Sequence, residues 1–292
     1  MRARIVPRSD LPKIRGADWV DPERDPFVEG DYAWIPVRPG EAFDVEIPER
    51  SRYSGRGWYM IGDVAVIHGD KPSPDEMREI LRFRHPRGIL WIAALEDITR
   101  TPRTELLWGE AGEVRHREGG YTFIMDPQKV MFSMGNRYEK MRLAALLRAG
   151  SGHERVADMF AGIGYFSIPL AAAGSWVHAI EINPVAFGYL ERNIRENRLA
   201  DHITASLGDC RTSLTGIYDR IVMGHFEAVN MLPDALAHAM AGTVLHIHSI
   251  GQAVDQIDTA AKGAGFSATI QVHKVKKYRP HAWHVVQDVT LS

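Results

Sequence analysis

The sequence predicts an α/β protein with a Rossmann-like, doubly wound sheet and a smaller N-terminal α+β module. Three observations support this. From about residue 155, strand-like and helix-like segments alternate; a glycine-rich turn joins the first of these strands to its helix; and residues 55–130 combine short strands with one helix. With 292 residues, of which 45% are hydrophobic and 25% charged, the chain can bury a sizeable core.

We expect three parts along the chain. Residues 1–54 are rich in Pro, Asp and Arg and contain short strand-like pieces at 32–37 and 43–47, which predicts a partly extended lead-in. Residues 55–130 form the α+β module, a candidate for RNA contact. Residues 131–292 form the domain with the doubly wound sheet.

The α+β module begins with a strand over 60–67, followed by a helix with a complete start signal. Ser73 is a capping residue, Pro74 suits the first helical position and Glu76 completes a capping box. A strand over 88–95 follows. Strand-like pieces at 106–108, 114–117 and 121–126 suggest an antiparallel set.

The larger domain opens with a helix over 137–148 that ends at Gly150-Ser-Gly. Strands are expected at 155–160, 176–180, 203–207, 219–223 and 242–248, with helices after Gly164, over 184–197, around 231–240 and over 252–263. This alternation is typical of a parallel sheet. Strands at 269–275 and 284–289 form a final antiparallel pair.

The glycine turn and three acids indicate a ligand. Gly162 and Gly164 let the backbone turn tightly and approach a bound group. Glu181 ends the next strand, about 20 residues on, where an acid can accept both hydroxyls of a ribose. Asp209 follows the third strand and can accept from an adenine amino group. Together with Asp158, which starts the loop, they predict an adenosine-containing ligand at the carboxyl ends of the strands.

Two adenosine cofactors compete for this site. A dinucleotide prefers a third glycine in the loop, where this chain has Ser167. Asp158 would repel a pyrophosphate but suits the cationic methionine end of S-adenosylmethionine. The loop therefore favours S-adenosylmethionine over NAD.

Several motifs then resemble one known group of enzymes. The stretches 158–169, 179–184, 193–197 and 208–211 are similar to the class I S-adenosylmethionine-dependent domain shared by two tRNA-modifying families. One family methylates N1 of guanosine 37. The other, the wybutosine-synthesizing enzyme, transfers a 3-amino-3-carboxypropyl group to the tricyclic base derived from that guanosine in tRNA(Phe). Residues 129–142 and 275–289 also resemble both, so the likeness covers about 60–292.

Two short segments favour the second family. Gly224-His225-Phe226 stands where the methyltransferases carry Asn-Leu-Pro, and Ser133-Met-Gly-Asn136 replaces their Ser-Pro-Arg. The resemblance implies an aminocarboxypropyltransferase that acts on C7 of 4-demethylwyosine at position 37 in the anticodon loop of tRNA(Phe). The alternative is a tRNA guanine(37)-N1 methyltransferase. A catalytically silent, nucleoside-binding RNA module is the second function class.

The resemblance also implies roles for individual residues. Cofactor contacts are expected from the loop and acids above and from further residues, namely Ser133, Lys140, Phe160, Asn183 and the backbone N–H of Cys210. The family pattern has Arg where this chain has Lys140, which keeps the charge but loses the bidentate fork. Glu139 is the candidate acceptor of the proton displaced from the base. The residues alone leave open that Glu139 is an exposed i,i+3 partner of Arg142.

The net charge of −2 gives no sign of a nucleic-acid partner, but the charge is unevenly distributed. Residues 51–150 carry 16 basic and 13 acidic side chains, and residues 251–292 carry 5 and 3. A solvated mixed surface is the alternative to an RNA-binding face. The candidate RNA contacts are Arg115, Arg117, Lys276, Lys277 and Arg279.

Other features of the sequence bear on the compartment, on membrane contact and on metal binding. Cys210 is the single cysteine, so an internal disulfide is excluded and a reducing, cytoplasmic setting is expected. The start lacks the apolar region of a signal peptide, and we expect no membrane contact. His225, His246 and His248 lack a completing carboxylate or cysteine, so no metal is expected. A monomer is assumed.

Overall fold

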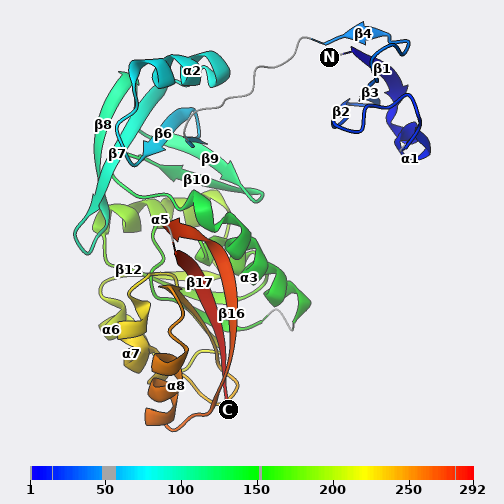
Figure 1. Ribbon diagram of the computed structural model, residues 1–292. Coiled ribbons are helices and arrows are strands. Elements are labelled where there is room, and N and C mark those ends of the chain that lie inside the picture. The colour runs from blue at the N-terminus through cyan, green and yellow to red at the C-terminus, as the bar shows by residue number, and fades with distance from the viewer. Residues whose placement is uncertain (1, 15, 48–56, 151–152, 280) are drawn as a thin grey trace. The chain divides into compact units, whose positions relative to one another are not determined.

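The computed structural model describes residues 2–14, 16–47, 57–150, 153–279 and 281–292 (Figure 1). The chain divides into two compact units, Met1–Gly55 and Arg56–Ser292. Among the described residues, no helix combines the length and the hydropathy needed to span a bilayer.

The N-terminal unit contains an antiparallel sheet with the order β2-β3-β1-β4. Its elements are β1 (Arg2–Pro7), η1 (Arg8–Asp10), α1 (Leu11–Ile14), β2 (Phe27–Glu29), β3 (Tyr32–Pro36) and β4 (Val45–Glu46). The strand-like pieces therefore pair with each other, and Ala3, Ala33 and Ile35 form a small buried core. The last residues expected in this lead-in, 48–54, lie outside the described residues.

A second sheet, β5-β6-β7-β8, begins the larger unit. Its elements are β5 (Tyr59–Ile61), β6 (Val64–His68), α2 (Pro74–Arg84), β7 (Gly88–Glu96) and β8 (Thr101–Gly109). The capping box at α2 is confirmed: the Glu76 N–H donates to Ser73 Oγ at 3.2 Å, and the Ser73 N–H donates to the Glu76 carboxylate at 2.7 Å. Because α2 forms the crossover, β6 and β7 are parallel.

Two expectations for this module need correction. The single strand expected over 60–67 is a hairpin, because Gly62 adopts a φ of 57° and reverses the chain between β5 and β6. The expected antiparallel set is also divided. β8 pairs with β7, whereas β9 (Val114–Glu118) and β10 (Tyr121–Met125) form a two-stranded sheet of their own.

Two asparagines of the larger domain hold the free edge of β10. Asn193 accepts the Ile124 N–H at 2.6 Å and donates to the Ile124 carbonyl at 3.2 Å. Asn197 accepts the Thr122 N–H at 3.0 Å and donates to the Thr122 carbonyl at 2.7 Å. The amides thus replace the hydrogen bonds of a missing strand. This gives the 193–197 motif a structural role that the sequence pattern did not reveal.

The main sheet has the order β13-β12-β11-β14-β15-β17-β16. Its strands are β11 (Arg155–Asp158), β12 (Trp176–Glu181), β13 (Ile203–Leu207), β14 (Arg220–Met223), β15 (Val244–Ile250), β16 (Ala268–Arg279) and β17 (Ala282–Leu291). The first five are parallel, and β17 runs antiparallel to both β15 and β16. The predicted fold class and the final antiparallel pair are confirmed.

Helices accompany this sheet, and the core lies on both of its faces. They are η2 (Met134–Asn136), α3 (Arg137–Ala149), α4 (Ser167–Ala171), α5 (Pro184–Glu196), α6 (Cys210–Ser213), η3 (Ala228–Met231), α7 (Leu232–Leu236) and α8 (Val254–Gly263). One apolar cluster joins Val156 to Ile168 and Leu190, and the other joins Ile221 to Leu232 and Ile257. In Figure 1, α6, α7 and α8 lie together at one end of the unit.

Candidate nucleoside-binding site

The carboxyl ends of β11, β12 and β13 bring three acids to one edge of the sheet. Asp158 ends β11, Glu181 ends β12, and Asp209 follows β13 by two residues. Adjacent strands are parallel, so these ends lie side by side. This edge is where ligands bind in open α/β sheets.

The glycine loop after β11 has a conformation that other residues would not tolerate. Gly162 and Gly164 have φ values of 57° and 103°. A Cβ on Gly162 would lie 2.2 Å from the Tyr165 ring, and one on Gly164 would lie 2.8 Å from Ile168 Cδ1. Glycine at these two positions therefore makes room for the side chains of Tyr165 and Ile168, which pack against the backbone of the loop.

Glu181 fixes this loop with its carboxylate. It accepts the Gly162 and Asn183 N–H groups, each at 2.7 Å. Burial raises the pKa of Glu181, and these N–H groups oppose the rise. A carboxylate has about four lone-pair sites, and three backbone N–H groups act on this one, so the acid can still accept from a ribose. Asn183 itself caps α5 and donates to the Thr99 carbonyl at 3.1 Å, which is a positioning role.

Asp158 is buried at the start of the glycine loop. Its fully buried carboxylate accepts from Ser167 Oγ at 2.7 Å and from the Phe160 N–H at 3.4 Å. Burial raises the pKa of Asp158 to about 6, despite the Ser167 hydrogen bond. Ser167, where a dinucleotide site would have glycine, is therefore the side-chain partner of this acid.

Asp209 and Cys210 start α6. Asp209 accepts the Arg211 N–H as the helix cap and also pairs with the Arg211 guanidinium, which lowers the pKa of the acid. An adenine amino group would share this carboxylate with Arg211. The Cys210 Sγ lies 3.6 Å from Met231 Sδ, and burial raises the pKa of the thiol to about 11. The thiol is therefore protonated and unreactive at neutral pH.

Two phenylalanine rings, a histidine and an arginine lie beside the glycine loop. His225, just after β14, stacks on Phe160 with ring centres 5.4 Å apart. Arg100 Nη1 lies 3.4 Å from His225 Nε2, and its guanidinium lies 5.9 Å from the Phe226 ring centre. Arg100 belongs to no motif, so the sequence did not indicate it. It lies in the tight turn between β7 and β8, where it adopts a φ of 50°.

Lys140, expected to contact the cofactor, lies in a buried ion pair. Its ammonium is 2.7 Å from the Glu118 carboxylate, and both side chains are at most 5% exposed. The ammonium also lies 4.7 Å from the Phe132 ring centre and 5.4 Å from that of Tyr165. Lys140 thus joins β9 to Tyr165 beside the glycine loop, and Glu118 is a second residue that no sequence motif indicated.

Replacing Lys140 with Met is expected to lower the free energy of unfolding by about 3–5 kcal/mol, because Glu118 would become a buried charge without a partner. The double variant Lys140→Met/Glu118→Gln removes both charges and should recover much of this loss. Urea denaturation of both proteins measures the difference. Equal stability of the single and double variants would contradict the assigned pair.

Glu139 pairs with Arg142, but not on an exposed helix surface. Both carboxylate oxygens of Glu139, which is 1% exposed, accept from Arg142 at 2.6 and 2.8 Å. Arg142 also donates to Asp288 on β17 at 2.7 and 2.9 Å. Burial alone would raise the pKa of Asp288, but hydrogen bonds from His246 and Arg142 hold it well below its usual range. This network ties α3 to the sheet.

Two of the histidines considered as metal ligands are buried at the sheet. His246 pairs with Asp288, and His248 Nδ1 lies 2.9 Å from His284 Nε2. The rings of Phe166 and Phe226 meet His248 and His284 edge-on. Within the described ranges, no group of three or more metal-ligating side chains is assembled.

The His248–His284 pair is expected to make stability fall in mild acid. Burial lowers the pKa of both imidazoles, that of His284 to about 4. As the pH falls below about 6.5, His284 takes up a proton in the unfolded chain but stays neutral in the folded one, so the free energy of unfolding decreases. The decrease due to His284 reaches about 3 kcal/mol by about pH 4. Urea denaturation at pH 7.5 and 4.5 should show a smaller fall for His284→Phe than for the wild type. Equal falls would contradict this assignment.

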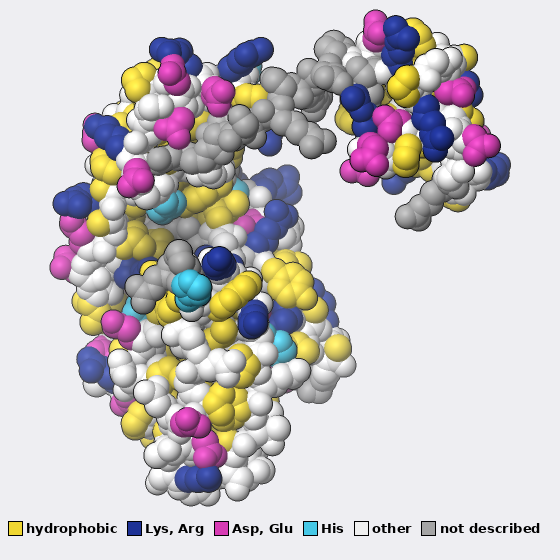
Figure 2. Space-filling view, viewed as in Figure 1, with side chains coloured by type: hydrophobic (Ala, Val, Ile, Leu, Met, Phe, Trp, Pro, Cys, Tyr) yellow, Lys and Arg dark blue, Asp and Glu magenta, His cyan; other side chains and the backbone are white. Residues whose placement is uncertain are grey.

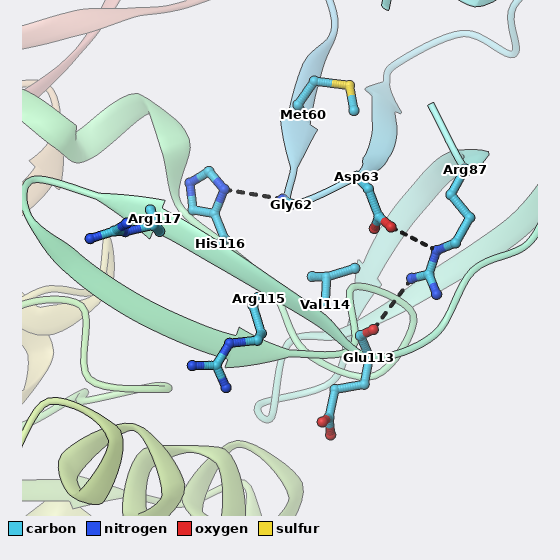
Figure 3. Close-up of a pocket in the computed structure, with 9 residues that line it drawn as sticks. All are labelled: Met60, Gly62, Asp63, Arg87, Glu113, Val114, Arg115, His116 and Arg117. Atoms are coloured by element: carbon cyan, nitrogen blue, oxygen red, sulfur yellow. Dashed lines mark hydrogen bonds and ion pairs between the residues drawn. The ribbon is translucent and has the colours of Figure 1, made fainter. Parts of the chain in front are cut away.

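The candidate RNA contacts lie on β9 and β16. Arg115 and Arg117 are exposed and border an open pocket of about 670 Å³, which is separate from the glycine loop (Figure 3). Arg115 pairs with Glu196. Lys277 is exposed, Lys276 is partly buried, and the side chain of Arg279 lies outside the described part of the chain. The face in Figure 2 mixes basic, histidine and hydrophobic side chains across the middle of the larger unit.

The comparisons with known proteins agree on one family. A family model described as the TRM5/TYW2 methyltransferase domain matches residues 114–275. A tRNA(Phe) (4-demethylwyosine(37)-C(7)) aminocarboxypropyltransferase from Methanocaldococcus jannaschii is 34% identical over 246 residues, which cover 80% of this chain and 97% of that protein. A Pyrococcus horikoshii protein with the same description is 31% identical over 271 residues, covering 87% and 96%.

Solved structures of two kinds share the fold. Pyrococcus horikoshii TYW2 in complex with MeSAdo is 28% identical with a TM-score of 0.69, and the match covers 81% of this chain and 90% of that one. Trm5b from Pyrococcus abyssi is 26% identical with a TM-score of 0.73, and the match covers 99% of each chain.

Proposed function

Because the chain belongs to the TRM5/TYW2 methyltransferase domain family, we propose that it is an S-adenosylmethionine-dependent tRNA aminocarboxypropyltransferase. It transfers the 3-amino-3-carboxypropyl group to C7 of 4-demethylwyosine at position 37 of tRNA(Phe), the reaction named for the M. jannaschii and P. horikoshii relatives. The observation that carries this choice is the segment after β14. There His225 stacks on Phe160, in place of the Asn-Leu-Pro expected of a methyltransferase.

The site suits S-adenosylmethionine. The glycine turn at Gly162, the carboxylate of Glu181 and the acid of Asp209 suit the loop, ribose and adenine positions of an adenosine. Phe160 and Ser133 are further proposed contacts, together with the Cys210 N–H. When bound, the cofactor supplies a sulfonium that makes the carbons attached to it electrophilic.

Transfer forms a bond between C7 of the base and Cγ of the aminocarboxypropyl group and breaks the Cγ–S bond, so that methylthioadenosine leaves. Positioning selects Cγ over the methyl carbon. C7 then loses its proton, and Glu139 is the proposed acceptor. The Glu139 carboxylate becomes available when the Arg142 guanidinium releases it. Arg142 can do so while keeping its hydrogen bonds to Asp288.

Contacts to the tRNA are proposed at Arg115, Arg117 and Lys277, whose side chains are exposed. Arg115 can exchange Glu196 for a phosphate, since an exposed ion pair contributes little stability. Such contacts would give the binding constant a modest dependence on salt.

One observation favours a second candidate, methyl transfer to N1 of guanosine 37. The match to Trm5b covers 99% of this chain, whereas the match to P. horikoshii TYW2 covers 81%. Overall fold therefore does not separate the two activities, and the transferred group must be measured.

The test supplies tRNA(Phe) with either 4-demethylwyosine or guanosine at position 37, and S-adenosylmethionine labelled in the carboxyl or the methyl group. We expect the carboxyl label to enter the 4-demethylwyosine tRNA alone. Methyl label in the guanosine tRNA, without carboxyl label in the other, would establish the second candidate. No label in either RNA would leave a nucleoside-binding module.

A further inference from the structure

Lys276 on β16 has an unusual position that the proposed RNA contacts do not use. Its side chain lies directly on the backbone of Gly135, where a Cβ would come within 2.1 Å of Nζ and 2.9 Å of Cδ. Gly135 belongs to η2, two residues after Ser133. The ammonium therefore occupies space that any larger residue at position 135 would fill.

The surroundings of this ammonium contain nitrogen groups but no available acid. His284 is the cross-strand partner of Lys276. Burial lowers the pKa values of His68 and His284, and the charge of Lys276 lowers them further. The nearby Glu118 is already paired with Lys140. Among the described residues, no hydrogen-bond acceptor or ion-pair partner contacts the Lys276 ammonium. A partly buried cation with this environment favours an anionic ligand.

A buried acceptor lies next in the chain. Asn136 is 8% exposed, and its side-chain Oδ1 has no hydrogen-bond partner within the described residues. A buried amide oxygen without a donor is costly, so this atom suits a ligand that donates. Lys276 and Asn136 together offer a cation for a carboxylate and an acceptor for an ammonium, the two charged groups of an α-amino acid.

This pair also lies on the loop side of the site. Phe132, three residues before Gly135, packs its ring on that of Tyr165 with centres 5.5 Å apart, and the Tyr165 ring packs on Gly162. Asp158, the other candidate for the amino-acid end, is fully buried and bonded to Ser167. We propose that Lys276 and Asn136 hold the carboxylate and the amino group of the aminocarboxypropyl moiety and thereby position its Cγ. The inference rests on the proposed function.

Binding of two ligands tests this assignment without turnover. Methylthioadenosine has the adenosine and sulfur of S-adenosylmethionine but lacks the amino-acid end. Lys276→Gln should weaken binding of S-adenosylmethionine by about tenfold or more, the loss expected for a charge-assisted hydrogen bond, and leave methylthioadenosine within about twofold by calorimetry. The control Lys274→Gln, at an exposed position of the same strand, should change neither affinity.

A second variant moves the ammonium while keeping its charge. Gly135→Ala places a Cβ against the flexible end of Lys276, and position 135 has no positive φ that would strain alanine. It should also weaken S-adenosylmethionine selectively. Equal losses for both ligands, or no loss for either, would overturn the proposal.

Weaker binding of tRNA to Lys276→Gln, with unchanged cofactor affinity, would assign the ammonium to an RNA phosphate and overturn the proposal as well. The carboxyl-label experiment on the wild type separates this inference from the function. A wild type that transfers the carboxyl label, together with unaltered ligand affinities in both variants, would refute the Lys276 subsite alone.

Discussion

Replacing Glu181 with Ala is expected to lower the affinity for S-adenosylmethionine by at least about 100-fold. The change removes the proposed ribose acceptor, and it also leaves the Gly162 and Asn183 N–H groups without the carboxylate that they share. Each hydrogen bond to a charged group is worth about 1.5–3 kcal/mol, so the combined loss exceeds a factor of 100. Isothermal calorimetry with the purified protein measures it.

A matched control for this variant is Glu191→Ala, which removes an exposed acid of α5. It should bind the cofactor like the wild type. A folded Glu181→Ala protein with unchanged affinity would show that the carboxyl edge of β12 does not hold the ribose.

Gly162→Ala is expected to destabilise the fold by about 2–4 kcal/mol and to abolish cofactor binding. Alanine at a φ of 57° costs about 1–2 kcal/mol, and its Cβ would lie 2.2 Å from the Tyr165 ring, which must then move. Displacing Tyr165 also disturbs the contact of its ring with the Lys140 ammonium. Urea denaturation and calorimetry give the two quantities.

Gly188→Ala is the opposite case. Gly188 lies inside α5, and a Cβ there would meet nothing within 4 Å. Alanine should therefore stabilise the protein by about 0.5–1 kcal/mol through its better helix propensity. If both glycine variants behaved alike, the special geometry assigned to the loop would be wrong.

The sequence predicted those features that local patterns determine. Alternating segments gave the parallel sheet, and the Ser73–Glu76 pattern gave the start of α2, because periodicity and capping depend on residues close together in the chain. The hairpin at Gly62 was missed because a strand pattern with one glycine does not show whether the chain reverses there.

The parts of the site that were missed depend on contacts between distant segments. Glu118 meets Lys140 across 22 residues, and Arg100 meets His225 across 125. Glu139 and Arg142 were paired correctly from their spacing. Their burial follows from Asp288 on β17, 146 residues beyond Arg142, which no helical pattern can indicate.

Identifying the nucleoside released in a single turnover tests the central claim most directly. Enzyme is mixed with S-adenosylmethionine and a limiting amount of tRNA(Phe) carrying 4-demethylwyosine, and the small-molecule product is separated by chromatography. Our account predicts one methylthioadenosine for each modified tRNA. Release of S-adenosylhomocysteine in its place would show that the methyl carbon is transferred and would contradict the account.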